Sequence, residues 1–209
     1  MAVRLKTKWH RSRRSRRNIE GSSQAKTVED LAGIIAFNIW KLAQETFRHM
    51  DKEGFTYTRD EQVMGVITEV IAFLMQVADR MVYGHLDDDE RGRFVNEMAH
   101  NLVRTMQANQ EEINGEGDYG TPFVATLNAR FASYAECSYD DTEGPGYAFK
   151  RVLGEKVFEA MATTDNKWVI EHVMEFEVPT MLKELRRMVT DVMGLRKSGK
   201  NRSDTVIKP

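Results

Sequence analysis

Glu97 and His100 are the residues whose types and spacing most directly suggest metal chemistry, since they stand three apart in a predicted helix. A Glu-x-x-His pair is half of the ligand set of di-iron carboxylate bundles, in which both side chains project into the core. Here the pair falls opposite the apolar stripe, in line with Arg93 and Arg104, and the sequence has no second Glu-x-x-His. We therefore expect an exposed ladder of ion pairs along this helix.

A second candidate site surrounds His172, at the border of an apolar helical face. Trp168 precedes His172 by four residues, Phe176 follows it by four, and Glu175 stands three residues on, within reach of the imidazole ring. A histidine beside an acid can bind a metal or relay a proton, although a structural histidine hydrogen-bonded to its neighbour is the commoner outcome. The sequence leaves both interpretations open.

The predicted first helix contributes a polar line of Asn38, Glu45 and His49. Glu45 and His49 are four residues apart, so they share one helix face. If packing buries this line, it either fixes the register of the bundle or lines a pocket together with a histidine from a later helix. The metal or small-molecule site of this alternative hypothesis comprises Glu45, His49, His172 and Glu175.

Other signatures of chemistry do not occur in the sequence. Cys137 is the single cysteine, which excludes a disulfide within the chain, and neither lysine nor histidine stands close to it in sequence to activate the thiol. The segment 49–60 has the glycine of a calcium loop but begins with His49 and ends with Asp60, where the loop needs an acid and a bidentate glutamate. Phosphate-binding glycine loops, nucleophile elbows and zinc-ligand spacings are missing. The sequence therefore predicts no cofactor.

Charge is distributed unevenly along the chain. Residues 1–17 hold eight Lys and Arg and no acid, so removing those eight charges from the net −2 leaves −10 for residues 18–209. An Arg- and Ser-rich stretch with little to bury is typical of disorder, and we expect a disordered basic arm over 1–26. The residues expected to contact an anionic partner are Arg11, Arg13, Arg14, Arg16 and Arg17.

Several roles of the arm remain open. A secretory signal is disfavoured because no apolar stretch follows the basic residues. A transit peptide, a segment that binds nucleic acid or an anionic membrane, and a solvated tail that contacts the acidic body are the alternatives.

Helical periodicity organises the rest of the chain into one all-α domain. The longest apolar pattern, over 58–86, covers roughly 200° of a helix, wider than the ~100° stripe of a helix buried on one side, so it predicts a central helix. Thr58 to Glu61 has the pattern of a capping box for this helix. Glu69 falls on its polar side and is expected to be solvated. The predicted helices are 27–50, 58–86, 87–113, 121–139, 147–161, 166–177 and 179–195.

We therefore predict a single bundle of six to seven helices over 27–195, followed by a flexible polar tail over 196–209. Pro179 requires either a kink or a new first turn, because it cannot donate a backbone hydrogen bond. Apolar runs fall short of the ~20 residues that span a bilayer, the longest being 31–40. The sequence thus predicts no transmembrane segment.

Elimination favours a non-enzymatic, cytoplasmic bundle that acts through protein–protein contacts as a homodimer. The amphipathic segment 179–195 is the expected interface, because it follows Pro179 and could pack separately from the rest. The arm would engage an anionic partner: protein, nucleic acid or membrane. The alternative is the metal- or small-molecule-binding bundle, with or without enzymatic activity. Convergence of its polar residues in the fold would distinguish the two.

Overall fold

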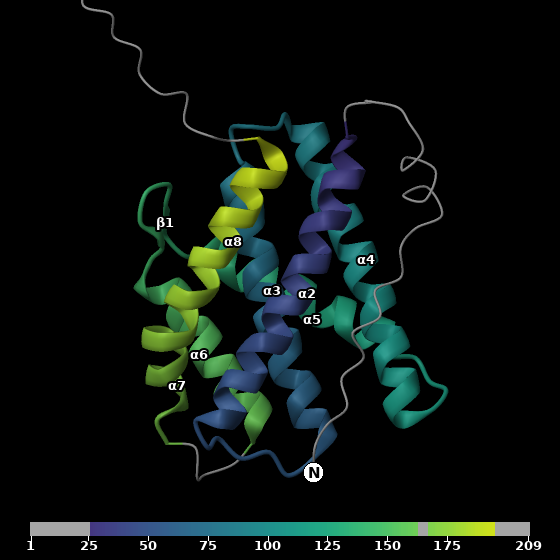
Figure 1. The fold of residues 1–209 in the computed structure, drawn as a ribbon, viewed down its shortest axis with the longest axis vertical. Helices are drawn as coiled ribbons and strands as arrows, with labels where there is room; N and C mark the ends of the chain where they lie inside the picture. Colours follow the sequence, from purple (N-terminus) through teal and green to yellow (C-terminus); the bar gives the residue numbers. More distant parts are fainter. Residues whose placement is uncertain (1–25, 163–166, 195–209) are drawn as a thin grey trace, which may run out of the picture.

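The computed structural model describes residues 26–162 and 167–194, which form an all-α bundle, as the sequence predicts (Figure 1). The predicted arm 1–26, except Lys26, and the predicted tail 196–209 lie outside the described residues. The elements are α2 (Val28–Lys52), α3 (Asp60–Val82), α4 (Asp88–Asn114), α5 (Gly120–Ala135), β1 (Tyr139–Asp140), β2 (Gly144–Pro145), α6 (Tyr147–Met161), α7 (Val169–His172), the π-helix η1 (Val173–Glu177) and α8 (Val178–Met193).

Helix α3 is the centre of the bundle, where it packs against α2, α4, α5, α6 and α8 (Figure 1). Apolar side chains on opposite sides of α3, such as Ile71 and Phe73, are fully buried. Among the described helices, α3 alone is long and apolar enough to cross a membrane, with a mean hydropathy of 1.4 over its most apolar window. Since 83% of that window is buried inside the bundle, packing accounts for the composition.

The polar side of α3 is also covered, contrary to the expectation that Glu69 is solvated. Glu69 is only 6% exposed, and its Oε2 and Oε1 accept hydrogen bonds from Arg130 Nε and Nη2 of α5 at 2.6 and 2.9 Å. Asp79 near the end of α3 is likewise bidentate with Arg91 of α4, at 2.7 Å for both contacts. The helices that cover this side therefore supply their own guanidinium groups to the buried acids.

Capping hydrogen bonds explain where the first helices begin. Thr27 Oγ1 accepts from Asp30 N, and Asp30 Oδ2 accepts from Thr27 N, both at 3.2 Å, which closes the predicted capping box of α2. The box predicted for α3 is wrong by one residue. Gln62, rather than Glu61, reaches back, and its Oε1 accepts from Thr58 N at 2.7 Å.

The predicted sixth and seventh helices form one continuous run through α7, η1 and α8. Val178 N–H donates to Val173 O, five residues back, which is the hydrogen-bond pattern of a π-helix. Pro179 follows in the first turn of α8, where a missing N–H is tolerated. Of the two predicted outcomes at Pro179, the new first turn is therefore correct, and the chain enters it from a π turn without a loop.

A short antiparallel hairpin occupies part of the predicted loop 140–146. Strands β1 and β2 pair Tyr139 with Pro145 and Asp140 with Gly144. Asp140 Oδ1 accepts from the backbone N–H groups of Thr142 and Glu143, both at 2.8 Å, and these bonds hold the turn and lower the pKa of Asp140. The hairpin packs beside α8 and is seen at the left of Figure 1.

Candidate functional site

Two of the predicted site residues meet at a buried acid that the sequence did not single out. Glu177, at the end of η1, is only 4% exposed. Its Oε1 lies 3.1 Å from His172 Nε2 and its Oε2 lies 3.7 Å from His49 Nδ1. A single carboxylate thus links the C-terminal half of α2 to the run of α7 and η1. We call His49, His172 and Glu177 the carboxylate bridge.

Aromatic rings enclose the bridge on the side of His172. The imidazole ring lies 4.8 Å from the ring of Phe55, in the loop after α2, and stacks 5.3 Å from the ring of Phe176. The hydroxyl of Tyr57, from the same loop, is buried without a hydrogen-bond partner among the described residues. Burial raises the pKa of Tyr57, and the negative charges of Asp51 and Glu177 raise it further. Tyr57 therefore stays neutral beside the bridge.

The other two predicted residues do not join this group. Glu45 and Glu175 are both exposed. A regular helix would bring the residue three positions after His172, Glu175, to its ring. The π turn closes hydrogen bonds over five residues instead, and it brings Glu177, five positions on, to His172. Pro179 was the single sequence signal of an irregular turn here, and it does not identify the turn as a π turn.

The bridge is not arranged as a metal centre. Within residues 26–162 and 167–194, no group of three or more His, Cys, Asp and Glu side chains could hold a metal ion. One nitrogen of each imidazole ring instead faces one oxygen of Glu177, an arrangement that orients both rings. Its geometry fits a structural link between α2 and η1.

The outer face of α7 and η1 carries large aromatic side chains in water. Trp168 is 75% and Phe176 is 65% exposed, and His172 stands midway between them at four-residue spacing. Glu171 and Glu175 form a second exposed row beside the aromatic one. We call this face the aromatic–acidic strip, and it consists of Trp168, Glu171, His172, Glu175 and Phe176.

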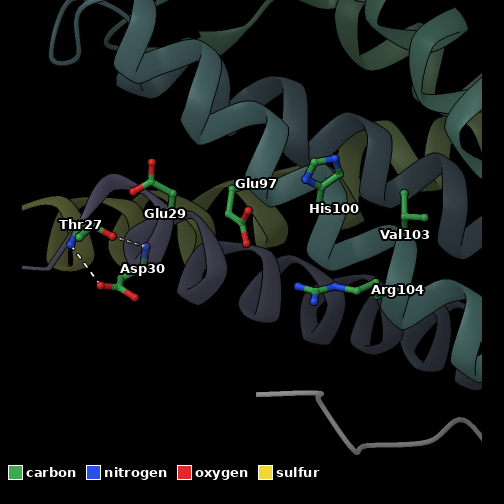
Figure 2. Close-up of a pocket in the computed structure, with 7 residues that line it drawn as sticks. All are labelled: Thr27, Glu29, Asp30, Glu97, His100, Val103 and Arg104. Atoms are coloured by element: carbon green, nitrogen blue, oxygen red, sulfur yellow. Dashed lines mark hydrogen bonds between the residues drawn. The ribbon is translucent and has the colours of Figure 1, made fainter. Parts of the chain in front are cut away.

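A hollow of about 460 Å³ lies between the start of α2 and the middle of α4. Figure 2 shows the side chains that line it. Several of its polar groups already have partners: Thr27 and Asp30 cap each other, and Glu29 Oε1 accepts from Arg93 Nη1 at 2.8 Å. A second hollow, of about 680 Å³, lies along the loop after α2 and is lined in part by Phe55. The acids that line the first hollow, Glu29, Asp30 and Glu97, therefore each have a partner within the bundle.

The Glu97–His100 pair lines the first hollow, in a different arrangement from the expected ladder. His100 is exposed, whereas Glu97 is half-buried. Asn101 Nδ2 donates to Glu97 Oε1, and Asn101 Oδ1 accepts from Arg104 Nη2, both at 2.9 Å. Arg93 bonds to Glu29 and to Asp89 rather than to Glu97. The ladder of ion pairs is therefore wrong, because Asn101 takes the place of a direct contact.

The structure also describes two other features considered in the sequence, the thiol of Cys137 and the predicted interface in α8. Burial raises the pKa of the Cys137 thiol, in the direction expected of an unreactive cysteine. The apolar side of α8 is packed inside the bundle, with Met181, Leu185 and Val189 almost fully buried. The reason for expecting the interface at 179–195 is therefore wrong. The arm residues Arg11, Arg13, Arg14, Arg16 and Arg17 lie outside the described residues.

Comparison of this chain with models of known families, with curated proteins and with solved structures finds no match.

Proposed function

We propose that this protein is a non-enzymatic helical bundle that acts through protein–protein contacts as a homodimer, in the reducing environment of the cytoplasm. The observation that carries this proposal is the exposure of Trp168 and Phe176 on one face of the helical run through α7 and η1. Tryptophan is enriched among residues that contribute most to binding between proteins. Neighbouring exposed aromatic side chains on a folded surface mark an interaction site.

The engagement of the polar residues supports a binding role over a catalytic one. His172 Nε2 and His49 Nδ1 face Glu177, and the buried acids of α3, Glu69 and Asp79, are paired with Arg130 and Arg91. A catalytic group needs a free site beside it for the substrate. The exposed aromatic rings of the strip, by contrast, have water on one side and are available for contact.

The basic arm supplies the second part of the proposal, an anionic partner. The charge asymmetry between residues 1–17 and the rest of the chain supports it. Arginine pairs with carboxylates and stacks on aromatic rings, so the partner can be a protein surface as well as a phosphate backbone or an anionic membrane.

Sedimentation analysis of the full chain over a range of concentrations tests the proposal. We expect a dimer whose dissociation constant rises about 30-fold in Trp168→Ser or Phe176→Ser, the effect of losing an aromatic side chain at the centre of an interface. Tyr147→Ser is the matched control, because Tyr147 is 65% exposed on α6, outside the strip. A chain that stays monomeric at high concentration, or that responds equally to all three changes, would refute it.

The convergence of His49 and His172 favours the second candidate function, binding of a metal or small molecule. Elemental analysis of protein purified without chelator or metal resin tests it. Stoichiometric iron, manganese or zinc that disappears in His49→Ala and His172→Ala would replace the first proposal. Metal-free protein with an unchanged fold would refute the metal form of this candidate.

A further inference from the structure

The aromatic–acidic strip has the chemistry to bind arginine side chains. Its exposed carboxylates, Glu171 and Glu175, stand beside the rings of Trp168 and Phe176 along the same helical run. A guanidinium group stacks on an aromatic face and at the same time donates two parallel hydrogen bonds to a carboxylate. The row of aromatic rings lies beside the row of carboxylates. Each arginine of a bound segment can therefore stack on a ring and pair with a carboxylate at the same time.

Acids also predominate along the exposed middle of the strip. Between Trp168 and Thr180, the exposed charged residues are Glu171 and Glu175, and no exposed Lys or Arg lies among them. Lys167 and Lys183 stand outside the two ends. In the ion pairs among the described residues, Glu171 and Glu175 have no partner. The two carboxylates are free to pair with an incoming cation.

The chain carries an arginine-rich segment of sufficient length. Arg11, Arg13, Arg14, Arg16 and Arg17 belong to the acid-free residues 1–17. Arg11 precedes Thr27 by sixteen residues, which span up to about 55 Å when extended. Helix α2 is about 37 Å long, and the carboxylate bridge joins its C-terminal half to η1. The arm is therefore long enough to reach the strip from the start of α2 on the same copy.

We propose that the arginine-rich segment 11–17 of this chain docks on the aromatic–acidic strip. This inference rests on the proposed function, because it identifies the anionic partner of the arm as the strip, on the same copy or on the second copy of the homodimer. Arginines contact Glu171 and Glu175 and stack on Trp168 and Phe176. The arm then needs no other anionic partner, whether a different protein, a nucleic acid or a membrane.

Cross-linking of the full chain tests the docking. In a Cys137→Ser background, Ser15→Cys places a thiol in the arm, and Thr180→Cys places one at an exposed position four residues after Phe176, next to the end of the strip. The control pair is Ser15→Cys with Asn96→Cys, an exposed position on α4 that also neighbours an acid, Glu97. We expect a short bis-maleimide to join Ser15→Cys to Thr180→Cys about tenfold faster than to Asn96→Cys at low salt, the combined effect of exposed stacking and ion pairing.

Two further changes identify the contacts. The preference should disappear in Glu171→Gln/Glu175→Gln and in Trp168→Ser/Phe176→Ser, with thermal unfolding used to confirm that these exposed substitutions leave the fold intact. It should also weaken at high salt, because exposed ion pairs are screened. Equal cross-linking at both positions, or a preference that survives both double substitutions, would overturn the inference.

Mixing experiments show whose arm is bound. Cross-linking between one chain carrying Ser15→Cys and another carrying Thr180→Cys places the arm on the second copy, and cross-linking within the double variant alone places it on its own copy. Both results support docking. Sedimentation keeps this test separate from the proposed function: a dimer that shows no cross-linking preference refutes the docking alone, whereas a monomer refutes the proposed homodimer.

Discussion

At the scale of single residues, a buried ion pair fixes how two helices pack at the centre of the bundle. Glu69 of α3 is 61 positions away from Arg130 in sequence, yet the carboxylate and guanidinium groups meet through two hydrogen bonds in a site that excludes water from Glu69. A buried pair adds little stability over an apolar pair of similar size, but the loss of one partner leaves an uncompensated charge. The pair therefore fixes how α5 sits on α3.

Arg130→Met tests this dependence. We expect a loss of about 3 kcal/mol in the free energy of unfolding, the lower end of the range for a broken buried pair, because the Arg130 side chain is 18% exposed. Denaturant titration gives the value. Glu69→Met/Arg130→Met is the control, since two apolar side chains leave no charge behind and should recover most of the loss. A double variant as unstable as the single one would contradict the role assigned to the charge.

Gly144 is the residue whose replacement should strain the hairpin most. Its φ is +95°, and a Cβ added there would lie 2.5 Å from Arg186 Nη2, a nitrogen that is itself buried. Gly144→Ala should cost about 1–3 kcal/mol for the left-handed conformation, together with displacement of the guanidinium group. Gly54→Ala isolates the first effect, because Gly54 has φ +89° and nothing within 4 Å of the added Cβ. We expect a larger drop in thermal midpoint for Gly144→Ala, and equal drops would show that Arg186 moves aside freely.

At the scale of the elements, the approach of α7 to α6 positions the strip. Gly154 is buried in α6, and a Cβ there would lie 3.0 Å from Ile170 Cγ2 and 3.1 Å from Ile170 O. Ile170 belongs to α7, the helix that carries the start of the strip. Only a residue without a side chain permits this contact, so the sequence position of Gly154 sets how closely the two helices pack.

Gly154→Ala should therefore destabilise the protein although alanine is the better helix former. The gain in helix propensity is about 1 kcal/mol, and overpacking against the backbone of Ile170 costs about 1–3 kcal/mol. Gly92→Ala provides the comparison, since Gly92 lies in α4 with nothing within 4 Å of the added Cβ. Thermal unfolding should show a lower midpoint for Gly154→Ala and a higher one for Gly92→Ala. Stabilisation by both would mean that α7 can shift without cost.

For the whole molecule, the helices were predictable because their hydrogen bonds are local. The bounds predicted for the fifth helix, 147–161, match α6. Contacts between distant segments were not predictable, because periodicity gives the faces of a helix but not its neighbours. Arg130, which covers the polar side of α3, is the clearest example. Glu177 was missed for a different reason: a π turn changes which residues share a face, and the sequence carries no distinct signal for it.

The central position of α3 also predicts how the molecule unfolds. Phe73 is fully buried, and its ring lies 6.0 Å from that of Tyr134 in α5 and 5.5 Å from that of Phe149 in α6. Phe73→Ala removes contacts to both helices at once and should cost about 3–5 kcal/mol. If α3 couples all its neighbours, circular dichroism and the fluorescence of Trp40, buried in α2 and left as the single tryptophan by Trp9→Phe/Trp168→Phe, should show one transition with a common midpoint in both proteins. Midpoints that separate in Phe73→Ala would instead show that α2 unfolds independently of α5 and α6.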